Sequence, residues 1–339
     1  MSIHRVAAID CGTNSIRLLI ADIDSNPDHL ERSRSSSDSA RSSRPPLADL
    51  AREMRIVRLG EGVDRTGRLS AAALDRTMTA LREYAGLIAE AKPESIRMVA
   101  TSATRDAENS REFTDRVIEV LGVAPEVISG DEEARLSFTG ATRELVGARP
   151  GADGTNPPPY LVTDIGGGST EFVLGDPMAA AAGAQLSGRS VNIGCVRLTE
   201  RHLHGDPPLA REISDTSADI DAALDQAAAT VAMAKAGTLV GLAGSVTTVA
   251  AIALGLDAYD SARIHHSRVS AARVHEIAAD LLAMTRAERA AIPAMHPGRI
   301  DVIGAGALIL DRIMTRFGFA EVLVSEHDIL DGIAWSLVP

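Results

Sequence analysis

Two aspartates occupy matching places in two similar stretches of the sequence. Asp10 and Asp164 each follow an apolar run and precede a turn of small residues, at 11–15 and 165–169, after which the chain is apolar again. The pattern predicts strand, turn, strand, occurring twice. Glycine lets backbone approach a ligand, and successive N–H groups can bind an anion. An acid beside such a turn suits a cation that bridges to phosphate, so the repeat predicts two related halves around one metal-phosphate site.

Further acids lie near these turns. Glu171 follows the second turn at a strand start, where it can point toward the same cleft. Residues 129–135 hold the densest acidic cluster. Ser129 and Glu132 fit a capping box, and acids favour the start of a helix, which leaves Glu133 unexplained. A carboxylate at a cleft mouth can deprotonate a water that attacks phosphorus, so Glu133 is either a general base or one more acid at a helix start.

Two other strand-to-helix turns carry small and polar residues. Residues 101–105, Thr-Ser-Ala-Thr-Arg, place hydroxyls and Arg105 where they can meet a phosphate, or they form a helix cap with a solvent-facing arginine. Gly244 and Ser245 repeat this arrangement in the second half. Cys195 is predicted to be a packed thiol, and the pair at 265–266, His-His, a surface loop, because neither has a partner at metal-ligand spacing.

Composition limits the class of protein. A net charge of −12 over 339 residues argues against nonspecific nucleic-acid binding and against a membrane surface. Two cysteines give no disulfide framework, and the N-terminus shows no leader, so a cytoplasmic protein is expected. The uncharged run at 238–256 contains several glycine, serine and threonine residues, which predicts a buried strand, a turn and a buried helix rather than a membrane span.

Strands and helices alternate along the chain, which predicts an α/β protein. Residues 25–46 are rich in Ser, Arg, Asp and Pro and predict a mobile loop at a hairpin tip, with a docking or phosphorylation segment as the alternative. A hinge is expected near 129–130, between domains at 1–128 and 129–326, with a terminal helix within 327–339 returning to the first. Besides the two repeats, the expected strands are 55–59, 96–100, 127–128, 190–193, 238–242 and 322–325, and the expected helices are 70–90, 103–121, 131–145, 196–204, 213–234, 271–284, 287–292, 302–317 and 328–337.

The ordered motifs resemble those of the exopolyphosphatase/guanosine pentaphosphate phosphatase family. The similarity covers nearly the whole chain outside 25–46, and it is greatest to short actinobacterial exopolyphosphatases, which lack the HD-type domain of longer relatives. The motifs are Asp-Cys-Gly-Thr-Asn-Ser at 10–15, Thr-Ser-Ala-Thr-Arg-Asp-Ala-Glu-Asn at 101–109, Ser-Gly-Asp-Glu-Glu-Ala-Arg at 129–135, Asp-Ile-Gly-Gly-Gly-Ser-Thr-Glu at 164–171 and Gly-Ser at 244–245.

The resemblance implies two RNase H-like domains of the actin, Hsp70 and sugar-kinase superfold, with an active cleft between them. It implies Glu133 as the catalytic base. It also implies a Mg²⁺ or Mn²⁺ ion held through Asp10, Asp164 and Glu171. The implied phosphate-binding residues are Thr13, Asn14, Ser15, Arg105, Gly166, Gly167, Gly168, Ser169, Gly244 and Ser245. One departure concerns residues 329–332, Ile-Leu-Asp-Gly, where many members have Leu-Arg-Glu-Gly; without the arginine, no phosphate contact from that helix is expected.

The expected reaction is hydrolytic release of terminal orthophosphate from inorganic polyphosphate. Hydrolysis of guanosine pentaphosphate is the alternative within the same chemistry, and it would connect the protein to the stringent response. A kinase of the same superfold and a sensor that binds polyphosphate or guanosine tetraphosphate without turnover are further alternatives. A homodimer is expected from the resemblance alone.

Overall fold

The computed structural model describes residues 3–24, 46–145, 156–181 and 184–338. The predicted mobile loop at 25–46 lies outside these residues except for Pro46. Among the described residues, no helix is both long enough and apolar enough to cross a membrane. This agrees with the interpretation of 238–256 as a strand followed by a helix.

The first sheet has five strands in the order β3-β2-β1-β4-β5. Strand β2 is antiparallel to both β1 and β3, whereas β4 is parallel to β1 and β5 is parallel to β4. Residues 6–11 of β1 are fully buried because helices cover both faces of the sheet. The strands are β1 (Ile3–Cys11), β2 (Ser15–Asp24), β3 (Leu47–Ile56), β4 (Ser95–Ala100) and β5 (Glu126–Val127).

The second sheet repeats this topology. Its order is β10-β11-β9-β6-β7-β8, and without the edge strand β10 the order from β8 to β11 matches that of the first sheet from β3 to β5. Here too, three antiparallel strands are followed by two parallel ones. Both sheets therefore have the predicted RNase H-like arrangement. The strands are β6 (Tyr160–Ile165), β7 (Thr170–Gly175), β8 (Ser187–Val191), β9 (Thr238–Leu242), β10 (Arg268–Ser270) and β11 (Glu321–Val324).

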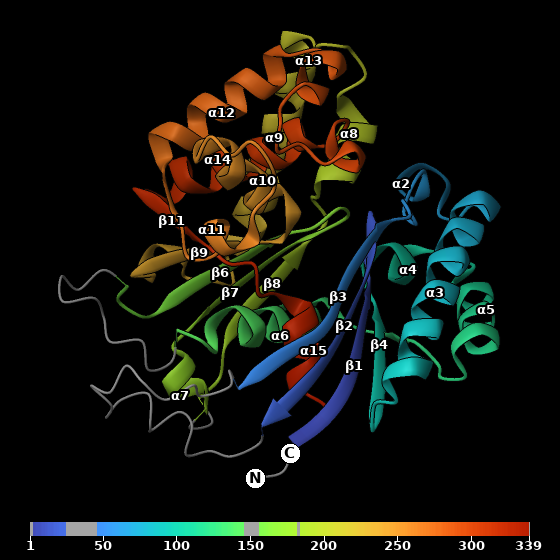
Figure 1. The fold of residues 1–339 in the computed structure, drawn as a ribbon. Coiled ribbons are helices and arrows are strands. Elements are labelled where there is room, and N and C mark those ends of the chain that lie inside the picture. The colour runs from blue at the N-terminus through green and yellow to red at the C-terminus, as the bar shows by residue number, and fades with distance from the viewer. Residues whose placement is uncertain (1–2, 25–45, 146–155, 182–183, 339) are drawn as a thin grey trace.

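Helices cover the outer face of each sheet (Figure 1). The long amphipathic helix α3 and helix α5 pack on the first sheet, and the larger set from α9 to α14 packs on the second. The helices of the first half are α2 (Val63–Thr66), α3 (Ala71–Ala91), α4 (Ser102–Asp106), α5 (Ser110–Leu121) and α6 (Gly130–Thr142). Those of the second half are α7 (Pro177–Ala181), α8 (Cys195–His202), α9 (Ala210–Ala228), α10 (Ala243–Ala253), α11 (Ser261–Ile264), α12 (Ala271–Ala283), α13 (Arg286–Ala290), α14 (Ile303–Phe317) and α15 (Ile329–Trp335), with 3-10 turns η1 (Met233–Lys235) and η2 (Pro297–Arg299).

Helices α6 and α15 lie together between the two sheets (Figure 1). Helix α6 follows the first sheet in sequence but packs on the second, through Ala134 and Phe138. Helix α15 follows the second sheet but packs on the first, through Ile329 and Ile333. Each half therefore contributes a helix to the core of the other, and the two cores cannot separate without breaking both contacts.

Glycines let α6 and α15 approach each other closely. A Cβ on Gly140 of α6 would overlap the carbonyl of Asp328, and a Cβ on Gly332 of α15 would overlap the carbonyl of Leu136. Backbone therefore packs directly on backbone where the helices cross. This contact fixes the start of α15 against α6, and both helices carry residues of the site described below.

Several predicted elements differ from the structure. The helix expected at 213–234 is α9, which ends at Ala228, and the strand expected at 190–193 is β8, which begins at Ser187. The strand expected at 55–59 is β3, which begins at Leu47 and ends at Ile56. None of its residues is buried, and charged residues interrupt the apolar ones, so the sequence lacks the alternation that marks a strand. The helix expected at 103–121 is broken into α4 and α5, because Ala107 is extended and ends the first of them. Helices α3 and α14 and strand β9 agree with their predicted ranges to within one residue.

Candidate active site

The two repeated turns have the same backbone geometry and touch each other. The N–H of Gly12 donates to the carbonyl of Ser15 at 3.0 Å, and that of Gly166 donates to the carbonyl of Ser169 at 3.0 Å. A Cβ on Gly168 would lie 2.7 Å from Thr13 Oγ1, so only glycine leaves room for this contact. The sequence repeat therefore corresponds to two equivalent turns that meet between the sheets.

Asp10 is neutralised on one side by an arginine. Arg17 lies opposite it on β2 and donates to Asp10 Oδ2 from Nη2 at 2.6 Å and from Nε at 3.0 Å. The same guanidinium donates to Asp328, at the start of α15. Asp10 Oδ1 is buried and has no hydrogen-bond partner among the described residues. Burial raises the pKa of Asp10, against the lowering effect of Arg17.

Asp164 occupies the equivalent position in the second sheet, but its neighbour has the opposite charge. Glu171 lies opposite Asp164 on β7, where the first sheet has Arg17 opposite Asp10. Hydroxyls hold both carboxylates: Ser137 donates to Asp164 at 2.7 Å and Ser190 donates to Glu171 at 2.7 Å. The second half therefore presents two adjacent acids where the first presents an ion pair.

Glu133 joins this acidic pair from the first turn of α6. It is 7 % exposed and accepts a hydrogen bond from Arg105 Nη1 at 3.0 Å. Ser129 caps the helix by accepting from the N–H of Glu132, as predicted, whereas the side chain of Glu132 pairs with Arg97. Because Arg105 binds Glu133, it does not face solvent. Ser129 caps the helix without Glu133, whose side chain points inward.

The acids affect one another's protonation. Burial raises the pKa of Glu133 well above its usual range; the charge of Glu171 raises it further, and Arg105 lowers it. Burial and the charge of Glu171 likewise raise the pKa of Asp164 well above its usual range, and burial raises that of Glu171. Three buried acids with one arginine beside them are costly when ionised, so the cluster would gain from a cation.

The buried carboxylates of the site have the chemistry of a site for Mg²⁺ or Mn²⁺; they are those of Asp10, Asp164, Glu171 and Glu133. Carboxylates are hard ligands, and Asp10 Oδ1 is a buried acceptor that lacks a partner. Asp10, Asp164 and Glu171 do not bring three oxygens within 4.8 Å of one another in the described part of the chain. Mg²⁺ commonly keeps several waters, so one or two of these carboxylates are enough to hold it.

Most of the predicted phosphate-binding residues lie in or next to the two turns. Thr13 Oγ1 is hydrogen-bonded to Ser102 Oγ at 2.9 Å, and Asn14 Oδ1 is buried without a partner among the described residues. The carbonyl of Gly167 accepts N–H groups from the start of α8, so this helix start is occupied by protein. Ser15, Gly166 and Ser169 close the turns through the backbone.

Gly244 and Ser245 were predicted to face a phosphate, but in the structure other side chains pack against them. The guanidinium of Arg299 fills the space where Gly244 would carry a Cβ, and Ser245 packs against Gly306 and Cys195 on the other side. No described residue forms an ion pair or hydrogen bond with the Arg299 guanidinium, and burial lowers its pKa. Arg299 is thus a cation above this turn that has no ion-paired carboxylate in the part of the chain that the structure describes. The sequence motifs did not indicate Arg299, because it lies about 55 residues after Gly244, in an irregular segment.

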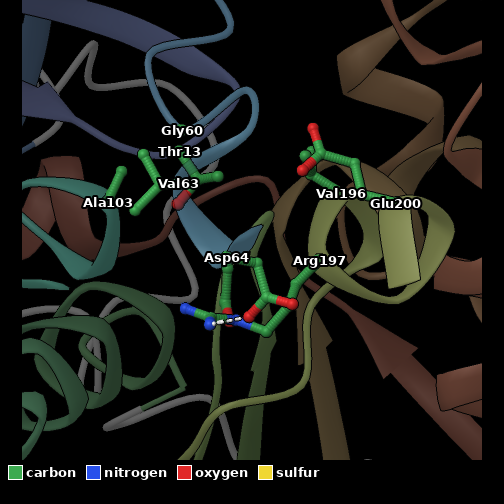
Figure 2. A pocket seen from close by; sticks show the side chains of 9 residues that line it. Thr13, Gly60, Val63, Asp64, Ala103, Val196, Arg197 and Glu200 are labelled. Carbon is green, nitrogen blue, oxygen red and sulfur yellow. Dashed lines mark hydrogen bonds and ion pairs between the residues drawn. The ribbon is translucent and has the colours of Figure 1, made fainter. Parts of the chain in front are cut away.

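Ion pairs of Arg197 join the halves beside the turns, and the pair with Asp64 is drawn in Figure 2. Arg197 of α8 pairs with Asp64 and Asp106 of the first half and donates to the carbonyl of Gly168 at 2.7 Å. The cavity beside it measures about 10 Å³, which is room for roughly one water. This edge of the contact between the halves is therefore closed to a phosphate chain.

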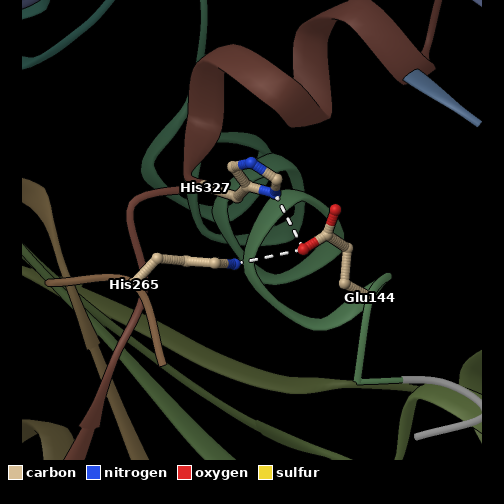
Figure 3. A group of neighbouring side chains, drawn as sticks. All are labelled: Glu144, His265 and His327. Carbon is tan, nitrogen blue, oxygen red and sulfur yellow. Dashed lines mark hydrogen bonds and ion pairs between the residues drawn. The ribbon is translucent and has the colours of Figure 1, made fainter. Parts of the chain in front are cut away.

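The predicted surface loop at 265–266 has a partner that the sequence spacing did not reveal. His265 Nε2 lies 3.1 Å and His327 Nδ1 lies 3.5 Å from Glu144 Oε2, so the fold assembles three possible metal ligands (Figure 3). His265 Nδ1 accepts the N–H of Glu326 at 3.1 Å, which places the hydrogen of the neutral ring on Nε2. That nitrogen then donates to Glu144, and the geometry favours a hydrogen bond over metal ligation.

Two RNase H-like halves that meet at paired acidic turns define a two-domain α/β protein with the actin-like fold. The chain belongs to the Ppx/GppA phosphatase family, whose model matches residues 37–339. The resemblance found in the sequence motifs is thereby confirmed.

Relatives match along the whole length of the chain. Exopolyphosphatase 2 of Mycobacterium tuberculosis is 48 % identical, with 99 % of each chain covered. A crystal structure of an exopolyphosphatase-like protein is 43 % identical, with a TM-score of 0.86 and 98 % of each chain covered. The Ppx/GppA enzyme of Aquifex aeolicus is 29 % identical, with a TM-score of 0.75, 99 % of this chain and 100 % of that chain covered. Similarity to the mycobacterial protein agrees with the predicted actinobacterial type.

Proposed function

We propose that the protein is an exopolyphosphatase, which hydrolyses the terminal phosphoanhydride bond of inorganic polyphosphate. The observation that carries this proposal is Glu133, a buried carboxylate beside Asp164 and Glu171 at the meeting point of the two turns. The name of the mycobacterial relative supports the same substrate. A kinase would need a second substrate as phosphoryl acceptor, whereas a base next to acidic side chains suits attack by water.

In the proposed reaction, Glu133 takes a proton from a water molecule as the water attacks the terminal phosphorus. Arg105 holds the carboxylate in place through its 3.0 Å hydrogen bond. Backbone N–H groups and hydroxyls of the two turns would position the phosphates, and Arg299 would supply positive charge from the second half. A divalent cation bound at the acids would neutralise charge on the phosphate oxygens.

A comparison of substrates tests the proposal. Purified protein is given long-chain polyphosphate, tripolyphosphate and guanosine pentaphosphate, each without a phosphoryl acceptor, and orthophosphate release is measured. Fastest release from long-chain polyphosphate is expected. Preference for guanosine pentaphosphate would instead favour the alternative substrate, and binding of polyphosphate or guanosine tetraphosphate without any release would favour a sensor.

Divalent cations are expected to stabilise the protein, and more so as the pH rises. Asp164 and Glu133 have raised pKa values in the fold, so their ionisation removes stability as the pH rises from the unfolded pKa values, about 4, toward the folded ones. A bound cation offsets that loss. In thermal unfolding, 5 mM Mg²⁺ or Mn²⁺ should raise Tm by a few degrees at pH 8 and by less at pH 5. A ligand near saturation adds about 2–3 kcal/mol to the free energy of unfolding.

Asp164→Asn is the variant for this cation experiment, and Glu132→Gln is its control, because Glu132 pairs with Arg97 away from the cluster. The Mg²⁺-dependent rise in Tm should shrink in Asp164→Asn and persist in Glu132→Gln. An equal rise in both variants would place the cation elsewhere.

Loss of Arg105 is expected to move the pH dependence of kcat/KM. The base acts as a carboxylate, so activity rises with pH as Glu133 loses its proton. Arg105 lowers the pKa of Glu133, and Arg105→Met should therefore move the acidic limb to higher pH. Arg97→Met removes a comparable ion pair from the neighbouring Glu132 and should leave the limb in place. An acidic limb of the kcat/KM profile that is unchanged or shifted to lower pH in Arg105→Met would contradict the role of Glu133.

We further propose, from family resemblance alone, a cytoplasmic location and a homodimer. The substrate class is compatible with a net charge of −12, because the local arginines and the cation act within the site itself. Size-exclusion chromatography with light scattering measures the oligomeric state directly.

A further inference from the structure

A second, larger cavity lies on the face of α6 that points away from the acids. Its volume is about 770 Å³, within the range of roughly 300–1,000 Å³ that is usual for small-molecule sites. Glu133 and Ser137, the residues of α6 that belong to the active site, are not among its walls. The walls are Asp131, Ala134, Arg135, Phe138, Thr139, Thr142 and Arg143 of α6 and its C-terminal end, Val173 of β7, Pro177 and Ala180 of α7, and Ala184, Gln185, Leu186 and Gly188 leading into and within β8.

The middle of this α6 cavity is apolar. Phe138 and Leu186 both pack over Gly175, which has no side chain to keep them away. At Gly188 a Cβ would have only ordinary contacts, 3.9 Å from the Cβ of Ala134 and 4.0 Å from Val173. The absent side chain of Gly188 therefore helps keep the cavity open, and a larger residue can be placed there without backbone strain.

Charge is distributed unevenly along the cavity. Arg143, at the C-terminal end of α6, has no ion pair or hydrogen bond from its guanidinium among the described residues; it lies 3.8 Å above the ring of Trp335. Burial lowers the pKa of Arg143. Among the described residues, the side chain of Arg135 donates to the backbone carbonyl of Asp131 and forms no ion pair. Asp131 lies at the opposite end of the helix, roughly 18 Å from Arg143 along the axis.

We propose that this cavity binds a small amphiphile that has one anionic head group and an apolar tail. The head pairs with Arg143, an exposed residue whose guanidinium has no ion pair or hydrogen bond among the described residues, and a charge-assisted hydrogen bond is stronger than a neutral one. The tail lies over Phe138 and Leu186. Asp131 lies at the far end of the cavity, so the anionic head is expected at the Arg143 end.

The chain supplies its own reporter for this site. Trp335 is the only tryptophan of the protein, and it lies beneath Arg143. Laurate and dodecyl phosphate are the anionic probes, and dodecanol is the neutral one of matched length. Titration below the critical micelle concentration, followed by Trp335 fluorescence and by calorimetry, should give saturable binding of at least one anion, about tenfold tighter than that of dodecanol. The anion that binds more tightly distinguishes a carboxylate from a phosphate head.

Three variants test where the probe sits. Arg143→Gln should weaken binding of the anion about tenfold and leave dodecanol unaffected. Gly188→Leu fills the cavity and should abolish binding, whereas Gly188→Ala, whose added methyl makes ordinary contacts, should retain it. None of these residues belongs to the proposed catalytic machinery, so orthophosphate release without probe serves as the check that each variant is folded.

Several results would overturn the proposal. Equal affinity for laurate, dodecyl phosphate and dodecanol would show that the site does not recognise an anionic head group. Unchanged binding in Gly188→Leu would show that the probes bind outside this cavity. Absence of binding by calorimetry would also reject it. Sedimentation that shows a dimer of the wild type and a monomer of Gly188→Leu would identify a second copy of the chain as the occupant. All of these are measured by binding or mass, and so they are independent of the proposed hydrolysis.

Discussion

Glu133→Gln is expected to lower the rate of orthophosphate release by about 10²- to 10⁴-fold, the usual contribution of a general base. The amide keeps the shape of the side chain and its contact with Arg105, but it cannot accept a proton from water. Binding of polyphosphate should be retained, since the change removes a negative charge close to a polyanion. Orthophosphate release and a separate binding titration measure the two effects.

The control for this experiment is Glu132→Gln, one residue earlier in the same turn of α6. Glu132 pairs with Arg97 outside the cluster, and its loss should change turnover by less than about threefold. If Glu133→Gln hydrolysed polyphosphate at a rate close to that of the wild type, another group would have to activate the water, and the proposed mechanism would be wrong.

Gly140→Ala is expected to destabilise the fold by roughly 1–3 kcal/mol or more, because its Cβ would overlap backbone atoms of Asp328. The clash cannot be relieved by a side-chain rotation, so α15 must move away from α6. Arg17 pairs with Asp328, and such movement would also disturb the position of Arg17 beside Asp10. Urea unfolding measures the loss of stability, and orthophosphate release measures the effect on the site.

Gly86→Ala provides the matched control for Gly140→Ala. Gly86 lies inside α3, where a Cβ would meet nothing within 4 Å, so alanine should be neutral or should stabilise the helix by up to about 1 kcal/mol. Equal stabilities of the two variants would show that α6 and α15 adapt to the added methyl group, and that their close crossing is not required.

The sequence predicted most of what depends on local pattern. The two turns were found because each has an apolar strand on both sides and glycine or other small residues between them. Helix α3 was found from its apolar periodicity, and Glu133 from the one acid that capping did not explain. Strand β3 was misplaced because residues such as Asp49 and Arg52 interrupt any alternation; they instead form an ion pair on the partly exposed strand.

What the sequence did not provide are contacts between distant residues. The pairing of Arg17 with Asp328 joins residues 311 positions apart, and the approach of Arg299 to Gly244 depends on how an irregular segment folds over a turn. The hydroxyl of Ser137 that holds Asp164 lies on a helix that crosses to the other sheet. Neither periodicity nor motif spacing encodes such contacts, because the topology of both sheets decides them.

The exchange of charge between equivalent strand positions has a consequence for how a substrate is oriented. Arg17 in the first half and Glu171 in the second occupy the same place in a duplicated structure. Linear polyphosphate has two chemically identical ends, and a pair of identical turns would offer it two equivalent directions of binding. Opposite charges at this one position remove that equivalence, so the duplicated fold can fix which of its two turns receives the end that is cut.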